Sequence, residues 1–260
     1  MSGFSTPLTE RADRVAAAIK LQRPVERRRA ARFLAEGPNL VEAALRRGVV
    51  SEVFVTEDAA VRFASLLGDT PAHIVTDKAA KALSDTVTPV GLVAVCRIPE
   101  VSLPDLLSGE PRLVAVAVET SDPGNAGTLI RLADAMGADA LILAGNSVDP
   151  YNAKCLRASA GSIFSVPVVS AADTLALISE LVYAGLVVMA TTLDGEASLA
   201  TLKLDVPTAW LFGSEAHGLP SEVAAAADVR VQIPMKGGAE SLNVAAAAAI
   251  CLYESSRALS

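Results

Sequence analysis

Short apolar runs separated by helix-like segments in the second half of the chain constrain the fold more than any other feature. The run RLVAVAVE at residues 112–119 is unbroken between its charged ends. A strand with one solvent-exposed face alternates apolar and polar residues, whereas a strand of a buried parallel sheet is apolar throughout. Five further runs lie at residues 138–144, 164–170, 185–192, 208–213 and 229–234. With helices between them, these runs predict an α/β domain with a parallel sheet.

The first part of the chain predicts a second, smaller α/β domain. Residues Thr9–Leu21 show the periodicity of an amphipathic helix, and strand and helix patterns then alternate from RFLAEG to GLVAVCRI. The segment IPEVSLPDLLSGEP at residues 98–111 holds three prolines and a glycine, which is typical of a domain boundary. We therefore expect one domain over residues 1–105 and another over residues 106–260.

Composition excludes several classes of protein. With 52% hydrophobic residues the chain is not disordered. Its three cysteines are far apart and form no CxxC pair, so we expect no metal site and a reducing compartment. The segment MSGFSTPLTERADR lacks the apolar core of a signal peptide, and no apolar run reaches the roughly 18 residues of a membrane span. The sequence predicts a cytoplasmic protein without a membrane segment.

Charge is distributed unevenly along the chain. The net charge is −7, yet residues 1–47 hold 10 Lys and Arg against 5 Asp and Glu. A basic end on an acidic protein suggests that this end contacts an anion. The alternative is that these arginines form solvated helix faces. The candidate anion-binding residues are Arg23, Arg27, Arg28, Arg29 and Arg32.

Three glycine-containing turns follow apolar runs of the second domain. In the first, Asp122 precedes Pro123 and predicts a helix N-cap, while Arg131 could simply pair with Asp134. The second is LFGSEAHGLP at residues 211–220. The third is IPMKGGAESLN at residues 233–243, where Ser241 is expected as an N-cap or first-turn residue. Carboxyl ends of parallel strands share one edge of a sheet, so we expect the three turns to lie together.

These segments resemble a known family. GNAGTLIRLADAMGAD, LFGSEAHGL and IPMKGGAESLNVAAAAAICLYE are similar to the three motifs of SpoU/TrmH-class SPOUT RNA 2′-O-ribose methyltransferases, and the arginine-rich start resembles TsnR-like rRNA methyltransferases. The resemblance implies a SPOUT-type trefoil-knotted parallel-sheet catalytic domain preceded by a small α/β ribosomal-protein-like substrate-binding domain. It also implies a homodimer that methylates RNA, most simply rRNA, with S-adenosyl-L-methionine as cofactor. With RNA as the implied substrate, the five arginines become the candidate RNA-binding residues.

The resemblance also implies roles for individual residues. The catalytic positions match Asn125, Arg131, Glu215, Ser241 and Asn243. The cofactor-binding positions match Gly213, Ile233 and Leu242, with Met235 and Leu219 as further walls of the same site. Arg131 could remove the proton of the ribose hydroxyl. Because the pKa of arginine normally exceeds about 12, it could instead stay cationic and stabilise the forming alkoxide.

Two other functions compete with methyl transfer. The first is a nicotinamide-dependent oxidoreductase, but Gly124 and Gly127 do not form the G-x-G-x-x-G pattern of dinucleotide-binding turns. The second is a non-catalytic RNA-binding or ribosome-assembly factor on the same fold. The presence of Arg131, Glu215 and Asn243 favours an active enzyme.

Overall fold

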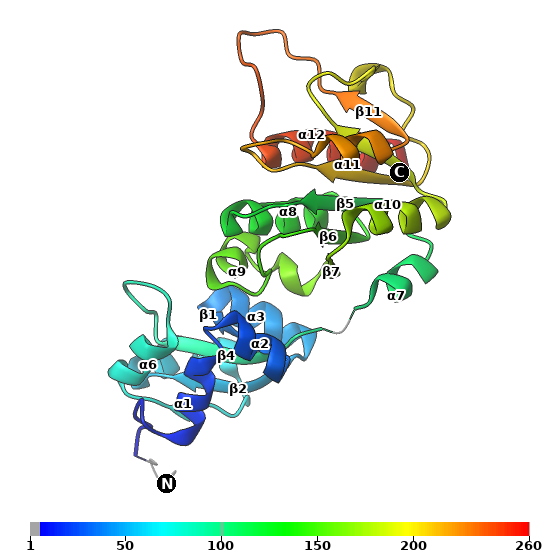
Figure 1. Cartoon of the computed structure of the whole chain (residues 1–260). Coiled ribbons are helices and arrows are strands. Elements are labelled where there is room, and N and C mark those ends of the chain that lie inside the picture. Colours follow the sequence, from blue (N-terminus) through cyan, green and yellow to red (C-terminus); the bar gives the residue numbers. More distant parts are fainter. Residues whose placement is uncertain (1–5, 100, 260) are drawn as a thin grey trace. The chain divides into compact units, whose positions relative to one another are not determined.

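A computed structural model describes residues 6–99 and 101–259, which divide into two compact units (Figure 1). The first unit comprises residues 1–100 together with Tyr151–Phe164, and the second comprises Val101–Pro150 together with Ser165–Ser260. The segment Tyr151–Phe164 therefore leaves the second unit and returns to it. No helix among the described residues is long and apolar enough to cross a membrane.

The first unit is a four-stranded mixed sheet covered by helices. The strand order is β1-β4-β2-β3, with β1 and β2 antiparallel to β4, and β2 parallel to β3. One face packs on α1 and α6 through Phe54, Val93 and Val95. The elements are α1 (Asp13–Lys20), α2 (Pro24–Ala30), β1 (Arg32–Glu36), α3 (Pro38–Arg47), β2 (Val50–Val55), α4 (Glu57–Arg62), α5 (Ala64–Leu67), β3 (His73–Ile74), α6 (Asp77–Leu83), β4 (Leu92–Arg97), α9 (Ala153–Ser159) and the 3₁₀ turn η1 (Ser162–Phe164).

The second unit is a seven-stranded sheet in which every pair of neighbouring strands is parallel, as the apolar runs predict. The strand order is β7-β6-β5-β10-β8-β11-β9. The elements are α7 (Leu103–Ser108), β5 (Leu113–Val118), α8 (Pro123–Ala135), β6 (Ala140–Ala144), β7 (Val168–Ala171), α10 (Thr174–Tyr183), β8 (Val187–Thr191), β9 (Ala197–Ser198), the 3₁₀ turn η2 (Leu199–Thr201), β10 (Thr208–Phe212), α11 (Ser221–Ala226), β11 (Val229–Gln232) and α12 (Val244–Leu259).

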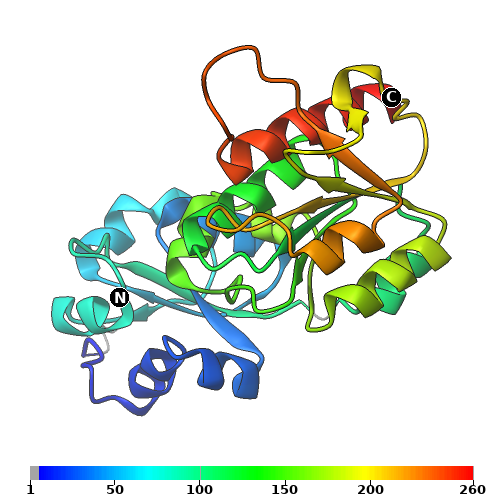
Figure 2. The ribbon, with the colours of Figure 1, turned by 45° about the horizontal axis from the view of Figure 1, so that its top comes forward.

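Helices cover both faces of this sheet. On one face, residues of β5, β8 and β10 pack with those of α7, α10 and α11. On the other face lie α8 and α12, which run side by side (Figures 1 and 2). After β11 the chain returns across the sheet, so that α12 also packs on β5 and β10. The indole Nε1 of Trp210 donates a hydrogen bond of 2.8 Å to Ser255 Oγ, and both residues are fully buried. This bond ties the last helix to the middle of the sheet.

Candidate cofactor cavity and RNA-contacting surface

A cavity of about 910 Å³ opens at the carboxyl edge of the second sheet. It lies where β8, β10 and β11 end, and these strands are neighbours in the order β10-β8-β11. Because the strands are parallel, the turns that follow them meet at one edge, which is where open α/β sheets bind ligands. The expectation that the glycine turns share one edge is confirmed by the strand directions.

The turn after β10 folds back on itself at the wall of this cavity. Ser214 and Gly218 exchange backbone hydrogen bonds of 3.1 and 2.8 Å. A Cβ atom at Gly213 would overlap the backbone of Gly218 and Leu219. Gly218 itself has a φ of 68°, which favours glycine. Both glycines are therefore required for this compact turn.

All five residues that match the cofactor-binding positions of the family line the cavity. Their side chains and backbone come from the turn after β10 and from the segment between β11 and α12. Met235 and Leu242 are 38% and 39% exposed, so the walls are apolar but accessible. The five residues are Gly213, Leu219, Ile233, Met235 and Leu242.

The structure also brings together three of the five expected catalytic residues. Glu215 and Ser241 line the cavity. Asn243 Nδ2 donates a short hydrogen bond to Glu215 Oε1, which joins the two turns. The Oδ1 atom of Asn243 accepts hydrogen bonds from the backbone N–H groups of Ala245 and Ala246, at 2.9 and 3.3 Å.

Asn243 is therefore the N-cap of α12, and the expectation that Ser241 occupies the cap or the first turn was wrong. The helix begins at Val244, three residues after Ser241. Serine and asparagine are almost equally good N-caps, so residue type alone could not decide between the two positions. Because Asn243 has both an acceptor and a donor, it can cap the helix and hold Glu215 at the same time.

The two remaining catalytic candidates lie apart from this group. Asn125 and Arg131 belong to α8, whose N-cap is Asp122 as expected, with Oδ1 accepting from Asn125 N–H at 2.9 Å. Neither residue lines the cavity. Arg131 is exposed, and no described residue gives it a hydrogen bond or an ion pair, so the alternative pairing with Asp134 does not form. The structure leaves this guanidinium free.

The sequence analysis missed the part of the cavity that follows β8. Thr191, Thr192 and Asp194 line it, and the hydroxyl of Thr192 is buried without a hydrogen-bond partner. Arg230 also lines this side of the cavity, where its guanidinium forms ion pairs with Glu196 at 2.9 Å and with Asp194 at 3.7 Å. The backbone and Arg230 hold the pKa of Glu196 below its usual value. Gly195 lies in this turn, and a Cβ there would overlap the backbone of β11, so an Asp-Gly pair after an apolar run was the signal present in the sequence.

The basic segment of the first unit folds into α2, a helix that the sequence did not predict. Four of the five arginines, Arg23, Arg28, Arg29 and Arg32, are exposed, and no ion pair to a described acidic residue forms at any of them. Arg27 differs, because the residue is only 4% exposed and its guanidinium donates to the carbonyl oxygens of Leu21 and Gln22 at 3.0 and 2.9 Å.

Strand pairing adds an arginine that the sequence analysis did not consider. Arg97 of β4 lies directly opposite Arg32 of β1 in the antiparallel register. Side chains at opposite positions share one face of a sheet, and like charges there repel unless an anion or water separates them. Arg97 also donates to the carbonyl oxygen of Gly48 at 2.9 Å. The exposed cations of α2 therefore continue onto the sheet.

Comparison with known proteins gives consistent likenesses. The SpoU rRNA Methylase family matches residues 112–253, and the MRM3-like substrate binding domain matches residues 12–94. The chain is 35% identical over 235 residues to the 23S rRNA (guanosine(2553)-2′-O)-methyltransferase RlmP of Bacillus subtilis, covering 90% of this chain and 92% of RlmP.

Solved structures agree with the sequence matches. The AdoMet complex of the SpoU methyltransferase AviRb from Streptomyces viridochromogenes has a TM-score of 0.84 at 30% identity, over 95% of this chain and 98% of that one. The AdoMet-bound rRNA methyltransferase from Sinorhizobium meliloti has a TM-score of 0.83 at 30% identity, over 97% of both chains.

These likenesses agree with the parallel sheet and the cavity at its carboxyl edge, and together they define the class, an RNA methyltransferase. The chain belongs to the SpoU rRNA methylase family, and its first unit carries the MRM3-like substrate-binding domain.

Proposed function

We propose that the protein methylates a ribose 2′-hydroxyl in 23S rRNA. It is an S-adenosylmethionine-dependent rRNA 2′-O-ribose methyltransferase. The choice of 23S rRNA is supported by RlmP, which matches over nine-tenths of both chains and acts on that RNA by its name. The observation that carries the assignment of the site is the bond between Glu215 and Asn243 beside the cavity.

The cavity suits S-adenosylmethionine in size and lining. Cofactor sites are commonly 300–1,000 Å³ and mostly apolar with a few placed polar groups. Leu219, Ile233 and Leu242 supply apolar walls, and the unpartnered Thr192 hydroxyl is available to a polar group of the ligand. The compact turn at Gly213 lets backbone approach the ligand closely. We assign these residues, with Met235, to cofactor binding.

The cofactor supplies an electrophilic methyl group, and the protein must supply alignment and a stabilised oxygen nucleophile. Holding the reactants in line contributes roughly 7–11 kcal/mol to barrier reduction. Glu215 and Ser241 line the cavity and Asn243 holds Glu215, and we assign these three residues to orienting the ribose. We assign Arg131 as the cation that stabilises the forming alkoxide and contacts the adjacent phosphate, because a guanidinium suits both tasks. Asn125, six residues earlier in the first turn of α8, positions the same nucleotide.

Arg131 does not line the cavity that Glu215 lines, which supports a site completed by a second copy of the chain. On α12, which packs beside α8, Ile250 is 38% and Tyr253 is 54% exposed, so an apolar strip is available for self-association. We propose a homodimer in which Arg131 of one copy serves the cavity of the other. In the cell this enzyme works in the cytoplasm, where its rRNA substrate is found.

The exposed arginines of the first unit contact RNA phosphates in this proposal. Arg23, Arg28, Arg29 and Arg32 have no acidic partner among the described residues, so their charge is available to an anion. Arg97 joins them through its position opposite Arg32. Arg27 is left out, because its guanidinium is buried.

Methyl transfer from labelled S-adenosylmethionine to 23S rRNA tests the function directly. The parent protein should label the ribose of one nucleotide, and Arg131→Ala and Glu215→Ala should each lower the rate about a hundredfold or more. Mixing the two variants should restore activity if each site combines both copies. Binding of 23S rRNA without methyl transfer would favour the non-catalytic alternative. Absence of rescue, with each variant dimeric, would contradict the shared site.

A further inference from the structure

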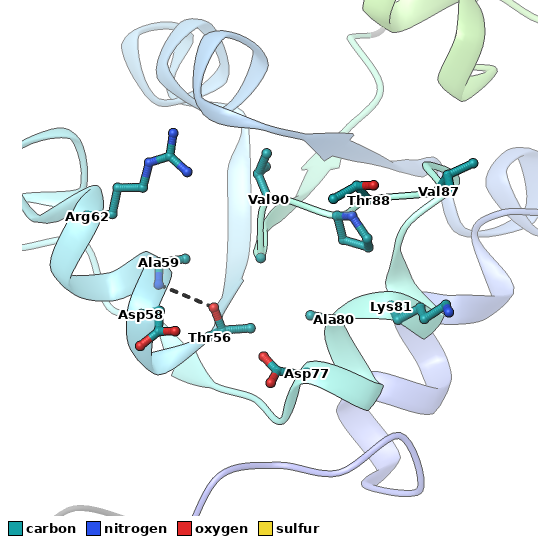
Figure 3. Close-up of a pocket in the computed structure, with 12 residues that line it drawn as sticks. Thr56, Asp58, Ala59, Arg62, Asp77, Ala80, Lys81, Val87, Thr88 and Val90 are labelled. Carbon is teal, nitrogen blue, oxygen red and sulfur yellow. Dashed lines mark hydrogen bonds between the residues drawn. The ribbon is translucent and has the colours of Figure 1, made fainter.

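A second cavity, of about 420 Å³, lies entirely within the first unit (Figure 3). It opens where β2 and β3 end, and these strands are the parallel pair of the four-stranded sheet. Each strand leads into a helix, α4 after β2 and α6 after β3. The third wall is the segment 87–91 that precedes β4. The cavity thus has the position at which parallel strands place ligands in larger sheets.

The lining of this cavity combines apolar surface with charged groups of both signs. Ala59, Ala80 and Val90 supply apolar contacts. Asp58 and Asp77 lie on one side of the space, with Thr88 and Val90 across from them (Figure 3). Neither carboxylate forms a hydrogen bond or an ion pair with a described residue.

Arg62 and Lys81 also line the cavity, and neither forms an ion pair within the described ranges. The helix dipole explains why acids occupy the first turns of α4 and α6 and bases the last turns. It does not explain why these charges surround a space. Glu57, beside Asp58 in the same turn, does not line the cavity.

The segment beside the cavity is anchored at both ends and holds an exposed apolar side chain. Val87 is 96% exposed. Just before it, Thr86 Oγ1 donates to Glu36 Oε1 at 2.9 Å and Asp85 N–H donates to Glu36 Oε2 at 3.3 Å. At the other end Gly91 has a φ of 74°, and a Cβ there would lie 2.5 Å from Thr56 Oγ1. An apolar group presented in this way suits contact with the face of a flat ligand.

We propose that this cavity binds one unstacked nucleotide of the RNA substrate, with guanine preferred. The proposal rests on the proposed function, because it takes the substrate to be RNA. Proteins that read RNA commonly accept single bases splayed out of loops and bond their Watson–Crick edges. Guanine presents two adjacent N–H donors on that edge, N1–H and the 2-amino group, and one carboxylate can accept both. Asp58 and Asp77 supply the carboxylates, and Val87 and Val90 contact the base face.

The two cations complete the match to a nucleotide. Arg62 and Lys81 follow Asp58 and Asp77 by four residues, so each cation lies one turn after an aspartate on the same helix face. A ligand with N–H donors at one end and a phosphate at the other satisfies both pairs of charges at once. The two carboxylates would repel a simple anion, and Arg62 and Lys81 would repel a simple cation. The lining therefore favours a nucleotide over either ion.

Nucleotide titration of the full chain with labelled valine methyl groups tests this site. We expect guanosine 5′-monophosphate at millimolar concentration to shift the Val87 and Val90 signals in a saturable manner. Inosine 5′-monophosphate, which lacks the 2-amino group, should bind more weakly, and uridine 5′-monophosphate weaker still. Asp58→Asn and Asp77→Asn should each weaken the binding of guanosine 5′-monophosphate about tenfold. Each substitution removes a negative charge that accepts, or stands beside, a hydrogen bond from the base.

The chain offers matched controls. Glu57→Gln changes a first-turn acid of the same helix outside the cavity, and Asp13→Asn does so on α1, so both should leave binding unchanged. Thr88→Trp should block the cavity without touching either carboxylate. Absence of any shift with all three nucleotides, or equal weakening by Glu57→Gln, overturns the proposal. If the parent protein methylates 23S rRNA but binds no nucleotide here, this inference alone fails. Nucleotide binding without methyl transfer would instead contradict the proposed function.

Discussion

Arg27 shows that neighbouring residues of one type can have different roles. It lies within a run of arginines, but its guanidinium is buried against the carbonyl oxygens of Leu21 and Gln22, just beyond the end of α1. Carbonyl groups at a helix end have no partner within the helix, and a buried arginine can supply the missing donors. The exposed Arg28 and Arg29 have no such bonds, so their charge remains available to RNA.

Substitution of Arg27 should therefore affect stability rather than RNA contact. Arg27→Ala removes the donors of two carbonyl groups in a buried setting, and we expect the free energy of unfolding of the first unit to fall by about 2–4 kcal/mol. Arg28→Ala and Arg29→Ala should change it by no more than about 0.5 kcal/mol. Urea unfolding followed by circular dichroism measures both effects.

The same three variants provide the complementary RNA measurement. Arg28→Ala and Arg29→Ala should weaken binding to 23S rRNA and reduce its dependence on salt, because each removes one phosphate contact. Equal destabilisation by all three variants would contradict the division of roles. Charge density in the sequence could not make this division, because it does not record which guanidinium the fold buries.

At the scale of elements, local pattern predicted the buried strands well and the exposed helices poorly. The runs at residues 112–119 and 208–213 became β5 and β10, because continuous apolar strands have a strong signal. The helix α2 was missed since its one large apolar residue, Val25, is 65% exposed and gives no periodicity. The sequence does not predict the short helix α7, because it lies within a proline-containing segment that is typical of a domain boundary.

The start of α12 determines how the cavity wall is held. Asn243 caps this helix through Oδ1 and holds Glu215 through Nδ2, so a single amide joins two turns that are 28 positions apart. Sequence motifs indicated that both residues belong to the site. They could not indicate that the two side chains are bonded to each other, because that contact depends on the strand order of the sheet.

Two substitutions of Asn243 should separate helix capping from positioning of Glu215. Asn243→Ala removes the cap and should cost about 1 kcal/mol of stability. Asn243→Asp keeps an acceptor that the helix start favours, so stability should stay within about 0.5 kcal/mol of the parent. Its carboxylate faces that of Glu215, however, and the repulsion should lower methyl transfer about tenfold or more. Urea unfolding and single-turnover methyl transfer measure the two effects.

The Asn243 prediction has a clear contrary outcome. Full methyl-transfer activity in Asn243→Asp would mean that the bond to Glu215 does not position the site. Loss of stability equal to that of Asn243→Ala would mean that the aspartate does not cap α12. As a matched control, Glu222→Gln changes an exposed first-turn residue of α11 that does not line the cavity, and it should alter neither quantity by much.

At the scale of the whole molecule, the order of the chain differs from the order in space. Residues Tyr151–Phe164 lie between β6 and β7 but belong to the first unit, where Phe33 contacts the rings of Tyr151 and Phe164 at centroid distances of 4.7 and 5.9 Å. A boundary placed from composition divides the chain once, whereas this segment crosses between units twice. Apolar periodicity is a local property, so it could not predict that this segment belongs to the first unit.

Each unit contains a buried thiol that should make its stability depend on alkaline pH. Burial raises the pKa of Cys96 in β4 and of Cys251 in α12 from 9.0 to about 12. Above about pH 9 the unfolded chain loses these protons while the folded chain keeps them, so stability is full below pH 9 and falls as pH rises toward 12. The expected loss is about 1.4 kcal/mol per thiol for each pH unit in this window.

The single tryptophan allows this prediction to be tested for the second unit alone. Trp210 is fully buried there, so its fluorescence reports unfolding of the unit that contains Cys251. Urea unfolding at about pH 8 and pH 10 should show a loss of stability in the parent and in Cys96→Ala. Cys251→Ala removes the titrating group and should be less sensitive to alkaline pH, even if the cavity it leaves lowers stability at both values. An unchanged pH dependence in Cys251→Ala would mean that other groups govern alkaline unfolding.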